Sequence, residues 1–518
     1  MLKRLLHLVL PLILLLSVSA QAAPDESGIF TLRIPDEPET LDWNKAHTEV
    51  ETYILMNIME GLVSFDSSVN LKPALASKWT ISSDGKTFTF NLRTDVKWSD
   101  GVPLKAQDFV YSWRRLLSPL TASTSAYLLF DVEGAKEYNQ GKLLDPSQVG
   151  VKAIDDHTLQ VKLTHSHPNW IFVPTFWVTF PLRQDLVEKY GQGWATPGRM
   201  VTLGPYELAY HDLDQRYGFV ANPKYYGKHG NIKKFFALIV KDNNAAIKLY
   251  EEGKIDFLND ISSGDLKRLS GRSDLKIFPY LKTDYLAFST NLYPFDAPSV
   301  RHAIGMAINR AEIKSVLPEA QPAGSFVPPP LLGYSAQAGL PFDPVKARAE
   351  LAASGFNFKD HKFTMILPDW ERTKLVGEFV QSQLKKNLGL ELELVPMKNQ
   401  AFRMNLDLHA SPFFLGHWSA DYPDPDNFLS IFLSNSGDNR FSWKNSEFDR
   451  IVNSASDLTD QTKRKPLYAH AQKILLQEQT VVVPLYYEPI VALVQKRVHG
   501  LVVNPVGYLL LSGVNVDH

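Results

Sequence analysis

Histidine and aspartate pairs are the first candidates for chemistry in this sequence. His165 and His167 are separated by one residue, so a strand would place both imidazoles on one face, where they could share a metal ion. The segment His211–Asp214 has the residue types of a metal site or of part of a catalytic triad. We interpret the first pair as a surface pair, because no third ligand is close in the sequence, and the second segment as a turn between strands.

The motifs of the common enzyme classes are absent. The sequence has no H-E-x-x-H, no G-x-S-x-G and no G-x-x-x-x-G-K-[ST]. It also has no cysteine, which excludes thiol catalysis, thiolate metal ligands and stabilising disulfides. We therefore expect no enzyme activity, no cofactor and no metal. A hydrolase or metalloenzyme that uses the His and Asp clusters is the alternative from another functional class.

The N-terminus has the layout of a secretory signal peptide. Lys3-Arg4 precede an apolar run from Leu5 to Val18, and Ala20-Gln21-Ala22 forms an A-x-A cleavage pattern. The apolar run is shorter than the roughly 20 residues that a membrane span needs. We expect residues 1–22 to be removed as a signal peptide, which leaves 518 less 22, or 496, residues.

The charge balance argues against two classes of partner. Removing Lys3 and Arg4 leaves 52 basic residues against 56 acidic ones. Nucleic acids and anionic membranes are bound through a basic surplus, which is missing here. Without cysteine there is also no N-terminal lipid anchor, so we expect a freely diffusing, monomeric protein of the periplasm.

Helices and strands alternate along the chain, which predicts an α/β fold. A single hydrophobic core stops growing near about 250–300 residues, so a chain of this length should form two or more lobes. The periodicities predict strands at 29–34, 87–92, 390–395 and 481–487, two short strands within 149–163, and helices at 49–60, 106–117, 245–253, 299–316, 345–354, 374–388 and 463–478.

An ordered series of motifs runs along nearly the whole chain. The series reads LKPALASKWTISSDGKTFTFNLRTDVKWSDGVPLKAQDFVYSWRRL at 71–116, VKAIDDHTLQVKL at 151–163, TPGRMVTLGPYEL at 196–208, YEEGKIDF at 250–257, VRHAIGMAINR at 300–310, HWSADYPDPDNFL at 417–429 and VVVPLYY at 481–487. In this order the motifs closely resemble family 5 of the bacterial extracellular solute-binding proteins, which includes the oligopeptide and dipeptide receptors of ABC importers.

The resemblance implies a periplasmic-binding-protein-like fold of type II. Its two lobes would enclose a ligand cleft, and an extra α+β domain would be attached. A ligand that contacts both lobes would stabilise the closed form. The implied boundaries are 23–60, 182–283 and 488–518 for lobe I, 61–181 for the extra domain and 284–487 for lobe II, with hinge crossings near 283 and 487.

The segment Trp418-Ser419-Ala420-Asp421-Tyr422 carries the most specific implied role. In the oligopeptide receptors the Asp of the matching W-x-A-D-Y segment meets the α-ammonium of the bound peptide, so the resemblance assigns this role to Asp421, with Trp418 as an apolar wall. A buried ammonium is costly unless it is paired, and a fixed carboxylate supplies a charge-assisted acceptor. From the residues alone, Asp421 is equally well explained as an exposed turn residue, because the segment 421–426 is rich in turn formers.

The remaining ligand contacts are expected along the peptide backbone, which receptors of this kind bind as an added strand. Candidate strand donors are His417–Ser419 and the residues near 41–47, where His47 falls close to an acidic position of the family. Tyr127 is the expected aromatic contact. The basic residue of the family before W-x-A-D-Y is missing, since 412–416 is uncharged. Arg372 is our candidate partner for the ligand carboxylate, and a solvated residue at a helix N-terminus is an equally good interpretation.

The sequence thus predicts a binding component of an ABC importer that captures a short peptide or peptide-like amine. Within the same fold, the ligand could instead be a murein peptide, a nickel chelate or another metal chelate, or a sugar. A sensory adaptor that presents its ligand to a membrane receptor would use the same binding chemistry.

Overall fold

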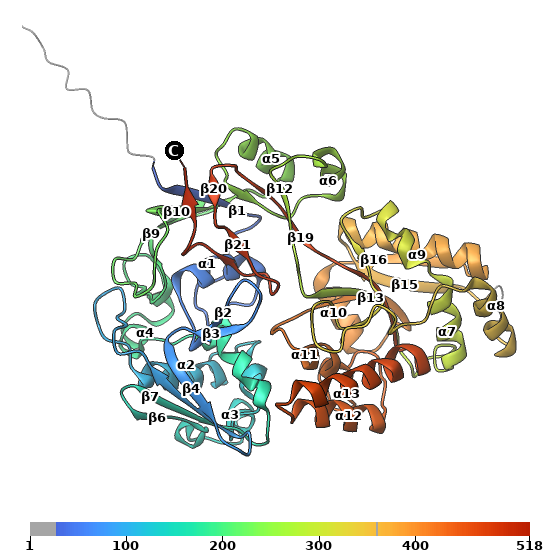
Figure 1. Ribbon diagram of the computed structural model, residues 1–518, viewed down its shortest axis with the longest axis horizontal. Helices are drawn as coiled ribbons and strands as arrows, with labels where there is room; N and C mark the ends of the chain where they lie inside the picture. Colours follow the sequence, from blue (N-terminus) through green and yellow to red (C-terminus); the bar gives the residue numbers. More distant parts are fainter. Residues whose placement is uncertain (1–26, 359–360, 518) are drawn as a thin grey trace, which may run out of the picture.

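The computed structural model describes residues 27–358 and 361–517, so the predicted signal peptide at 1–22 lies outside the described residues. The described chain forms two lobes and an extra domain, each built around its own β-sheet (Figure 1). Within these residues, none of the helices combines the length and the apolar character that crossing a membrane would require.

Lobe I contains a seven-stranded sheet in the order β12-β19-β11-β1-β10-β9-β8. The predicted strand at 29–34 is confirmed as β1, which pairs in parallel with β10 and buries Phe30, Leu32 and Ile34. The strands are β1 Ile29–Ile34, β8 Tyr206–Asp212, β9 Arg216–Ala221, β10 Lys234–Ile239, β11 Phe257–Leu258, β12 Leu275–Phe278 and β19 Ile490–Val494, and the helices are α1 Glu49–Ile58, α4 Gln184–Tyr190, α5 Asn243–Glu251 and α6 Ser263–Leu269.

Lobe II contains a six-stranded sheet in the order β14-β18-β13-β17-β15-β16, with helices around it. The strands are β13 Lys282–Phe288, β14 Gln321–Pro322, β15 Phe363–Pro368, β16 Leu392–Met397, β17 Phe413–Ser419 and β18 Val482–Tyr487. The helices are α7 Pro298–Ala307, α8 Pro344–Ala353, α9 Glu371–Leu388, α10 Asn399–Asp407, α11 Pro425–Leu429, α12 Ser446–Ser456 and α13 Gln461–Lys473.

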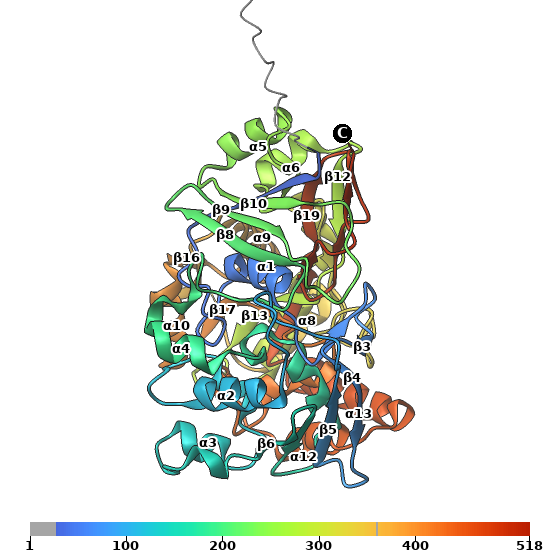
Figure 2. The same ribbon diagram turned by 90° about the vertical axis from the view of Figure 1, so that its left-hand side faces the viewer.

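The extra domain is a four-stranded antiparallel sheet in the order β4-β5-β7-β6, with α2 and α3 beside it. Figure 2 shows this domain below the sheet of lobe I. The predicted strand at 87–92 is confirmed as β5, whose residues alternate between partly and fully buried. The bounds are β4 Ala76–Ile81, β5 Thr87–Leu92, β6 Val151–Asp155, β7 Thr158–Lys162, α2 Ala106–Leu117 and α3 Ala135–Asn139.

The chain passes between the sheets of lobes I and II at two places. One passage is the segment 279–281 between β12 and β13, and the other is 488–489 between β18 and β19. The two passages run side by side, since β12 pairs with β19 in lobe I and β13 pairs with β18 in lobe II. The last residues of both lobe II strands and the connecting residues therefore lie between the lobes.

One predicted helix differs from the structure. The helix expected over 299–316 ends as α7 at Ala307, because Ile308 is extended, and a short 3-10 helix follows at Arg310–Ser315. Both Ile308 and Ile313 are fully buried in the core of lobe II. The apolar residues of the predicted helix are therefore still buried, although the helix is interrupted after Ala307.

Candidate ligand-binding site

A cavity of about 650 Å³ lies between the two lobes. This size is in the range of small-molecule and peptide sites. Lobe I contributes α1 and the segment 259–263, lobe II contributes β13, β17 and the start of α9, and the second passage and the start of β19 contribute 488–491. The lining residues are Pro35, Glu49, Val50, Tyr53, Asn243, Asn259, Asp260, Ile261, Ser262, Ser263, Tyr280, Lys282, Asp284, Trp370, Glu371, Arg372, Thr373, His417, Ser419, Glu488, Pro489, Ile490 and Val491.

The face that lobe II turns to the cavity follows from strand alternation. Asp284 on β13 is paired with His417 on β17, and Lys282 is paired with Ser419, so all four side chains lie on one face of the sheet. These four residues line the cavity. Trp418 lies between two of them and therefore points to the opposite face, where its indole N–H donates to Asn427 Oδ1 at 3.1 Å.

The two cationic side chains of the cavity are both paired with carboxylates of the protein. The ammonium of Lys282 forms an ion pair with Glu488 Oε2. Arg372 Nη1 lies 2.7 Å from Glu319 Oε1, and Arg372 Nε lies 3.3 Å from Glu488 Oε1. Burial alone would raise the pKa of Glu488. The charges of Lys282 and Arg372 outweigh burial and keep this pKa below its usual range. Glu488 is therefore an anion fixed between two cations.

Two other titratable groups on this face, Asp284 and His417, form no ion pair of their own among the described residues, although the charge of Lys282 acts on both. Burial raises the pKa of Asp284 to about 7, although the charge of Lys282 opposes the shift. Burial and the charge of Lys282 lower the pKa of His417 to about 3, so its imidazole is neutral at pH 7. Across the cavity, burial raises the pKa of Glu49 on α1, which accepts a hydrogen bond from Tyr53 at 2.5 Å.

Trp370 lies at the start of α9, at the edge of the cavity. Its side chain is 42% exposed, and its ring centroid lies 5.4 Å from that of His417. An accessible indole beside a neutral imidazole gives this edge of the cavity an apolar, aromatic surface.

Asp421 lies two residues after the end of β17 and is partly buried. Asn427 holds it in place: the Asp421 N–H donates to Asn427 Oδ1 at 3.0 Å, and Asn427 Nδ2 donates to Asp421 Oδ2 at 3.2 Å. Burial raises the pKa of Asp421 to about 6, against the effect of the Asn427 hydrogen bond. Within 27–358 and 361–517, no basic side chain is close enough to form an ion pair with this carboxylate.

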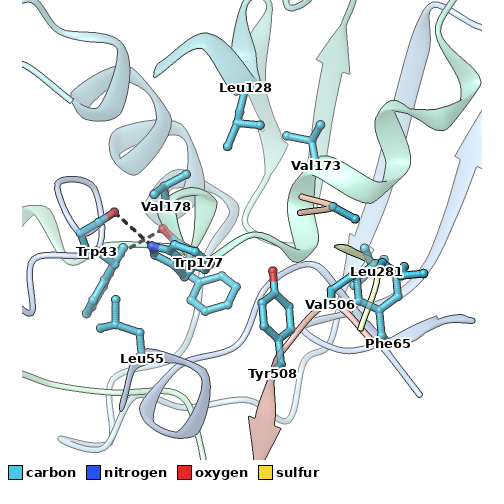
Figure 3. Close-up of a cluster of buried hydrophobic side chains, with 14 of the residues drawn as sticks. Trp43, Leu55, Phe65, Leu128, Val173, Trp177, Val178, Leu281, Val506 and Tyr508 are labelled. Carbon is cyan, nitrogen blue, oxygen red and sulfur yellow. Dashed lines mark hydrogen bonds between the residues drawn. The ribbon is translucent and has the colours of Figure 1, made fainter. Parts of the chain in front are cut away.

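Two tyrosines from the opposite half of the molecule lie near Asp421. Loss of water is the main cause that raises the pKa of both Tyr127 and Tyr508, and the charge of Asp421 raises them further. Tyr508 projects into the middle of an apolar cluster that includes Trp177 and Val173 (Figure 3). Its hydroxyl is buried and has no hydrogen-bond partner in the described part of the chain. The charge of Asp421 thus acts on a buried hydroxyl that has no hydrogen-bond partner among the described residues.

The turn that carries Asp421 is fixed by a buried ion pair. Asp424 caps α11 by accepting from the N–H of Asp426. Both oxygens of Asp424 also bind the guanidinium of Arg464 on α13, at 2.7 and 2.8 Å, and Arg464 is fully buried. Such a bidentate pair holds the turn in a fixed orientation.

The other predicted site residues occupy different places. Ser419, His417 and Arg372 line the cavity, whereas Trp418 and Asp421 lie just beyond it. His47 is not among the lining residues; its side chain is 41% exposed, with Nε2 3.9 Å from Glu39.

The histidine pair has a third neighbour after all. His167 Nδ1 lies 2.7 Å from Asp131 Oδ2, and His165 Nε2 lies 3.8 Å from Asp131 Oδ1. Asp131 is distant in sequence and close in space, so the sequence alone could not show this third neighbour. The three could offer ligand atoms within 4.8 Å of one another. In this structure His167 Nδ1 and Asp131 Oδ2 form a hydrogen bond with each other.

Several residues of the site are missing from the sequence-based prediction, namely Glu49, Lys282, Asp284, Glu488 and Tyr508. A signal for two of them exists, since Lys282 and Asp284 are charged residues two apart at the start of a strand that is otherwise buried. Glu488 directly follows the fully buried strand β18, which is unusual for a charged residue. No local pattern marks Glu49 or Tyr508, because the segments that meet around them are distant in sequence.

Comparison with known proteins places the chain in a family. Residues 70–440 match the family "Bacterial extracellular solute-binding proteins, family 5 Middle". The chain is 31% identical over 504 residues to the "Probable deoxycholate-binding periplasmic protein YgiS" of Escherichia coli K12, covering 93% of this chain and 92% of that protein. It is 32% identical over 487 residues to the "Periplasmic oligopeptide-binding protein OppA" of the same strain, covering 90% and 88%.

A solved structure supports the same assignment. The unliganded open form of MppA, a periplasmic murein tripeptide binding protein, superimposes with a TM-score of 0.82 and 28% sequence identity, covering 95% of this chain and 98% of that one. These relatives are named as binding proteins of the periplasm, and the family binds solutes without converting them, which confirms the expectation that the chain is not an enzyme. The chain belongs to family 5 of the bacterial extracellular solute-binding proteins.

Proposed function

We propose that this protein captures short peptides in the periplasm for the permease of an ABC importer, after cleavage of its signal peptide, and that the peptide α-ammonium binds Asp421. The observation that carries the proposal is the state of Asp421. Its carboxylate is partly buried and held by Asn427, and it has no cation partner among the described residues. An ionised carboxylate in such a place is stabilised by a bound cation.

The backbone around β17 supports a peptide ligand. His417–Ser419 pair with β13 on one side, whereas β15 pairs with β17 only at Phe414. The other edge of 417–419 is therefore free of a strand in the described part of the structure. An extended peptide could add to this edge through main-chain hydrogen bonds, which give affinity independent of side-chain identity.

The remaining contacts belong to the same proposal. Trp418 would act as a wall close to the ammonium, Tyr127 as an aromatic contact from the extra domain, and His47 as a contact at the entrance of the cleft. Arg372 would meet the ligand carboxylate only by exchanging Glu319 or Glu488 for it. The two passages between the sheets, at 279–281 and 488–489, support lobe boundaries near 283 and 487.

Calorimetric titration with trialanine tests the ammonium site. Asp421→Asn keeps the shape of the side chain and removes its charge, so we expect affinity to fall by about 3 kcal/mol, or roughly a hundredfold. N-acetylated trialanine should bind the natural protein equally poorly. Asp438→Asn is the matched control, because Asp438 lies near enough to raise the pKa of Asp421 and the proposal assigns it no contact with the ligand. Unchanged affinity in Asp421→Asn would exclude the ammonium site.

Native mass spectrometry of the protein purified from cells tests the ligand class directly. We expect a series of co-purified masses that correspond to short peptides. A single non-peptide mass would contradict the proposal.

A bile salt is the second candidate ligand, because one relative is named as a probable deoxycholate-binding protein. Deoxycholate is an anion with a large apolar body. The cavity of this protein contains five carboxylates and two cations, and both cations are already paired. Titration with deoxycholate separates the candidates, since binding tighter than that of trialanine would favour the bile salt.

A further inference from the structure

The residues that line the cavity carry more negative than positive charge. Its lining includes the carboxylates of Glu49, Asp260, Asp284, Glu371 and Glu488, against the cations of Lys282 and Arg372. A cleft lined by one sign of charge attracts ligands of the opposite sign. The excess of negative charge alone is a weak argument for a cation site, because exposed carboxylates are common. What decides is whether each charged group already has a partner in the protein.

The cations of the cavity have little capacity left for a ligand. Lys282 is bound to Glu488, and Arg372 is bound to both Glu319 and Glu488. A ligand carboxylate would have to displace a protein carboxylate from one of them. The free binding capacity of this face is therefore on its anions.

Asp284 is a lining carboxylate with an oxygen that accepts no hydrogen bond from the described residues. It is 6% exposed, and its Oδ2 atom has no hydrogen-bond partner among the residues that the structure describes. A buried polar atom without a partner costs roughly 1–3 kcal/mol, so such atoms are rare in folded proteins. Asp284 also lines the cavity, where the charge of Lys282 acts on it. On the facing wall, Glu49 lines the same cavity, and among the described residues the Tyr53 hydroxyl is its one hydrogen-bond partner, while the charge of Lys282 also acts on it.

We propose that Asp284, with Glu49 facing it, forms a subsite for a second positive charge of the ligand, such as a lysine or arginine side chain. This inference rests on the proposed peptide-binding function and specifies it. The preferred ligands are then short basic peptides, and the ligand carboxylate contributes little to recognition.

The register of the sheet limits where in the peptide the second charge lies. Asp284 is paired with His417, which is four residues before Asp421. Four residues of extended chain span at most about 14 Å. A peptide that adds along β17 with its ammonium on Asp421 would therefore place one of its first four side chains near Asp284.

Titration of the full mature protein with a set of tripeptides tests the subsite. The set is Ala-Ala-Ala, Ala-Lys-Ala, Ala-Ala-Lys and Ala-Glu-Ala. We expect at least one lysine peptide to bind roughly tenfold or more tightly than trialanine, as a charge-assisted hydrogen bond contributes, and the glutamate peptide to bind less tightly. Asp284→Asn should remove the lysine preference and leave trialanine binding within about twofold.

Two further variants keep the test interpretable. Glu49→Gln should reduce the lysine preference from the opposite wall, and it serves as the test if Asp284→Asn fails to fold. Asp95→Asn is the matched control, because Asp95 lies outside the cavity lining, pairs with Arg93 at 3.1 Å and is 60% exposed; it should leave the preference unchanged.

The outcomes separate the subsite from the function. Tripeptides that all bind with equal affinity, or a lysine preference that survives both Asp284→Asn and Glu49→Gln, overturn the subsite and leave peptide binding intact. Failure of every tripeptide to bind overturns the proposed function, and the subsite with it.

Discussion

At the scale of single residues, the site depends on carboxylates whose charge is incompletely compensated by the protein. Asp421 has one amide as its partner, and Asp284 has an oxygen without any partner in the described chain. Their pKa values, about 6 and about 7, are raised chiefly by burial. A bound cation would favour the ionised form of each, so ligand binding and proton release are coupled.

This coupling predicts a pH dependence for trialanine, which can use Asp421 but has no side-chain charge for Asp284. The pKa of Asp421 is about 6 in the ligand-free protein and falls when the ammonium binds. Affinity should therefore be full above pH 7 and be lost as the pH falls below 6, by roughly tenfold between pH 7 and 5. Titrations at four pH values measure it, and the profile of Asp421→Asn should be flat. A natural protein whose affinity rises on acidification would contradict this assignment.

Tyr508 gives a second prediction at this scale. Its buried hydroxyl has no partner in residues 27–358 and 361–517, so Tyr508→Phe should leave the thermal midpoint unchanged or slightly raised. If the hydroxyl meets the ligand beside Asp421, the same variant should weaken trialanine binding by roughly tenfold. Calorimetry and thermal unfolding of the one variant give both results. A lower midpoint with unchanged affinity would mean that the hydroxyl only supports the fold.

The sequence predicted Asp421 but not its surroundings. The W-S-A-D-Y segment identifies the position through its resemblance to a family, whereas the residues alone left a turn as an equal explanation. The tyrosine near Asp421 comes from residue 508, and the wall facing Asp284 comes from residue 49. Contacts between such distant segments have no local signature, so only the folded chain reveals them.

At the scale of secondary-structure elements, the binding turn is supported by the junction of α11 with α13. The Asp424–Arg464 pair is buried, bidentate and located next to the turn that carries Asp421. Removing one partner leaves a buried charge without compensation. The fixed orientation of Asp421 therefore depends on a contact that does not itself touch the cavity.

Asp424→Ala should lower the free energy of unfolding by roughly 3–5 kcal/mol. Lys346→Ala is the surface control, because Lys346 pairs with Glu350 across one turn of α8 at 3.9 Å with its side chain 60% exposed. Its loss should cost at most about 0.5 kcal/mol. Urea denaturation of both variants measures the difference. Equal small losses would show that the buried pair does not stabilise the turn.

Most elements were predictable because their periodicity is local. The alternation in β5 and the apolar stripes of α2 and α9 appear in the structure close to their expected bounds. The break after α7 was not predictable, since extended and helical backbone both bury Ile308 and Ile313. Trp418 shows a further limit of prediction from the sequence. His417 and Ser419 line the cavity, whereas the side chain of Trp418 points away from it because of the register in which β17 pairs with β13.

At the scale of the whole molecule, lobe II also contacts the extra domain, away from the cavity. The ring of Tyr422 in lobe II stacks on Phe172, in the segment after β7, with centroids 5.9 Å apart and planes 6° apart. Close by, Asp426 Oδ2 lies 3.8 Å from His167 Nε2. These contacts join the two halves without a ligand, so they contribute to the balance between open and closed forms.

Phe172→Leu should shift that balance toward the open form. An aromatic pair contributes about 1 kcal/mol, so trialanine affinity should fall roughly fivefold, and small-angle scattering should show a larger radius of gyration without ligand. Phe176→Leu is the control, because Phe176 stacks on Trp177 within the same half. A radius that is unchanged in Phe172→Leu and equal to that of the control would contradict the role of this contact.

The fluorescence of Trp370 should report ligand binding in the cleft. The sequence contains ten tryptophans, and among the residues that the structure describes Trp370 is the one that lines the cavity, with its side chain 42% exposed. A guest that displaces water from this indole would shift its emission to shorter wavelengths. Arrival and departure of an unlabelled guest could then be timed by stopped-flow fluorescence, and Trp370→Phe would silence that signal.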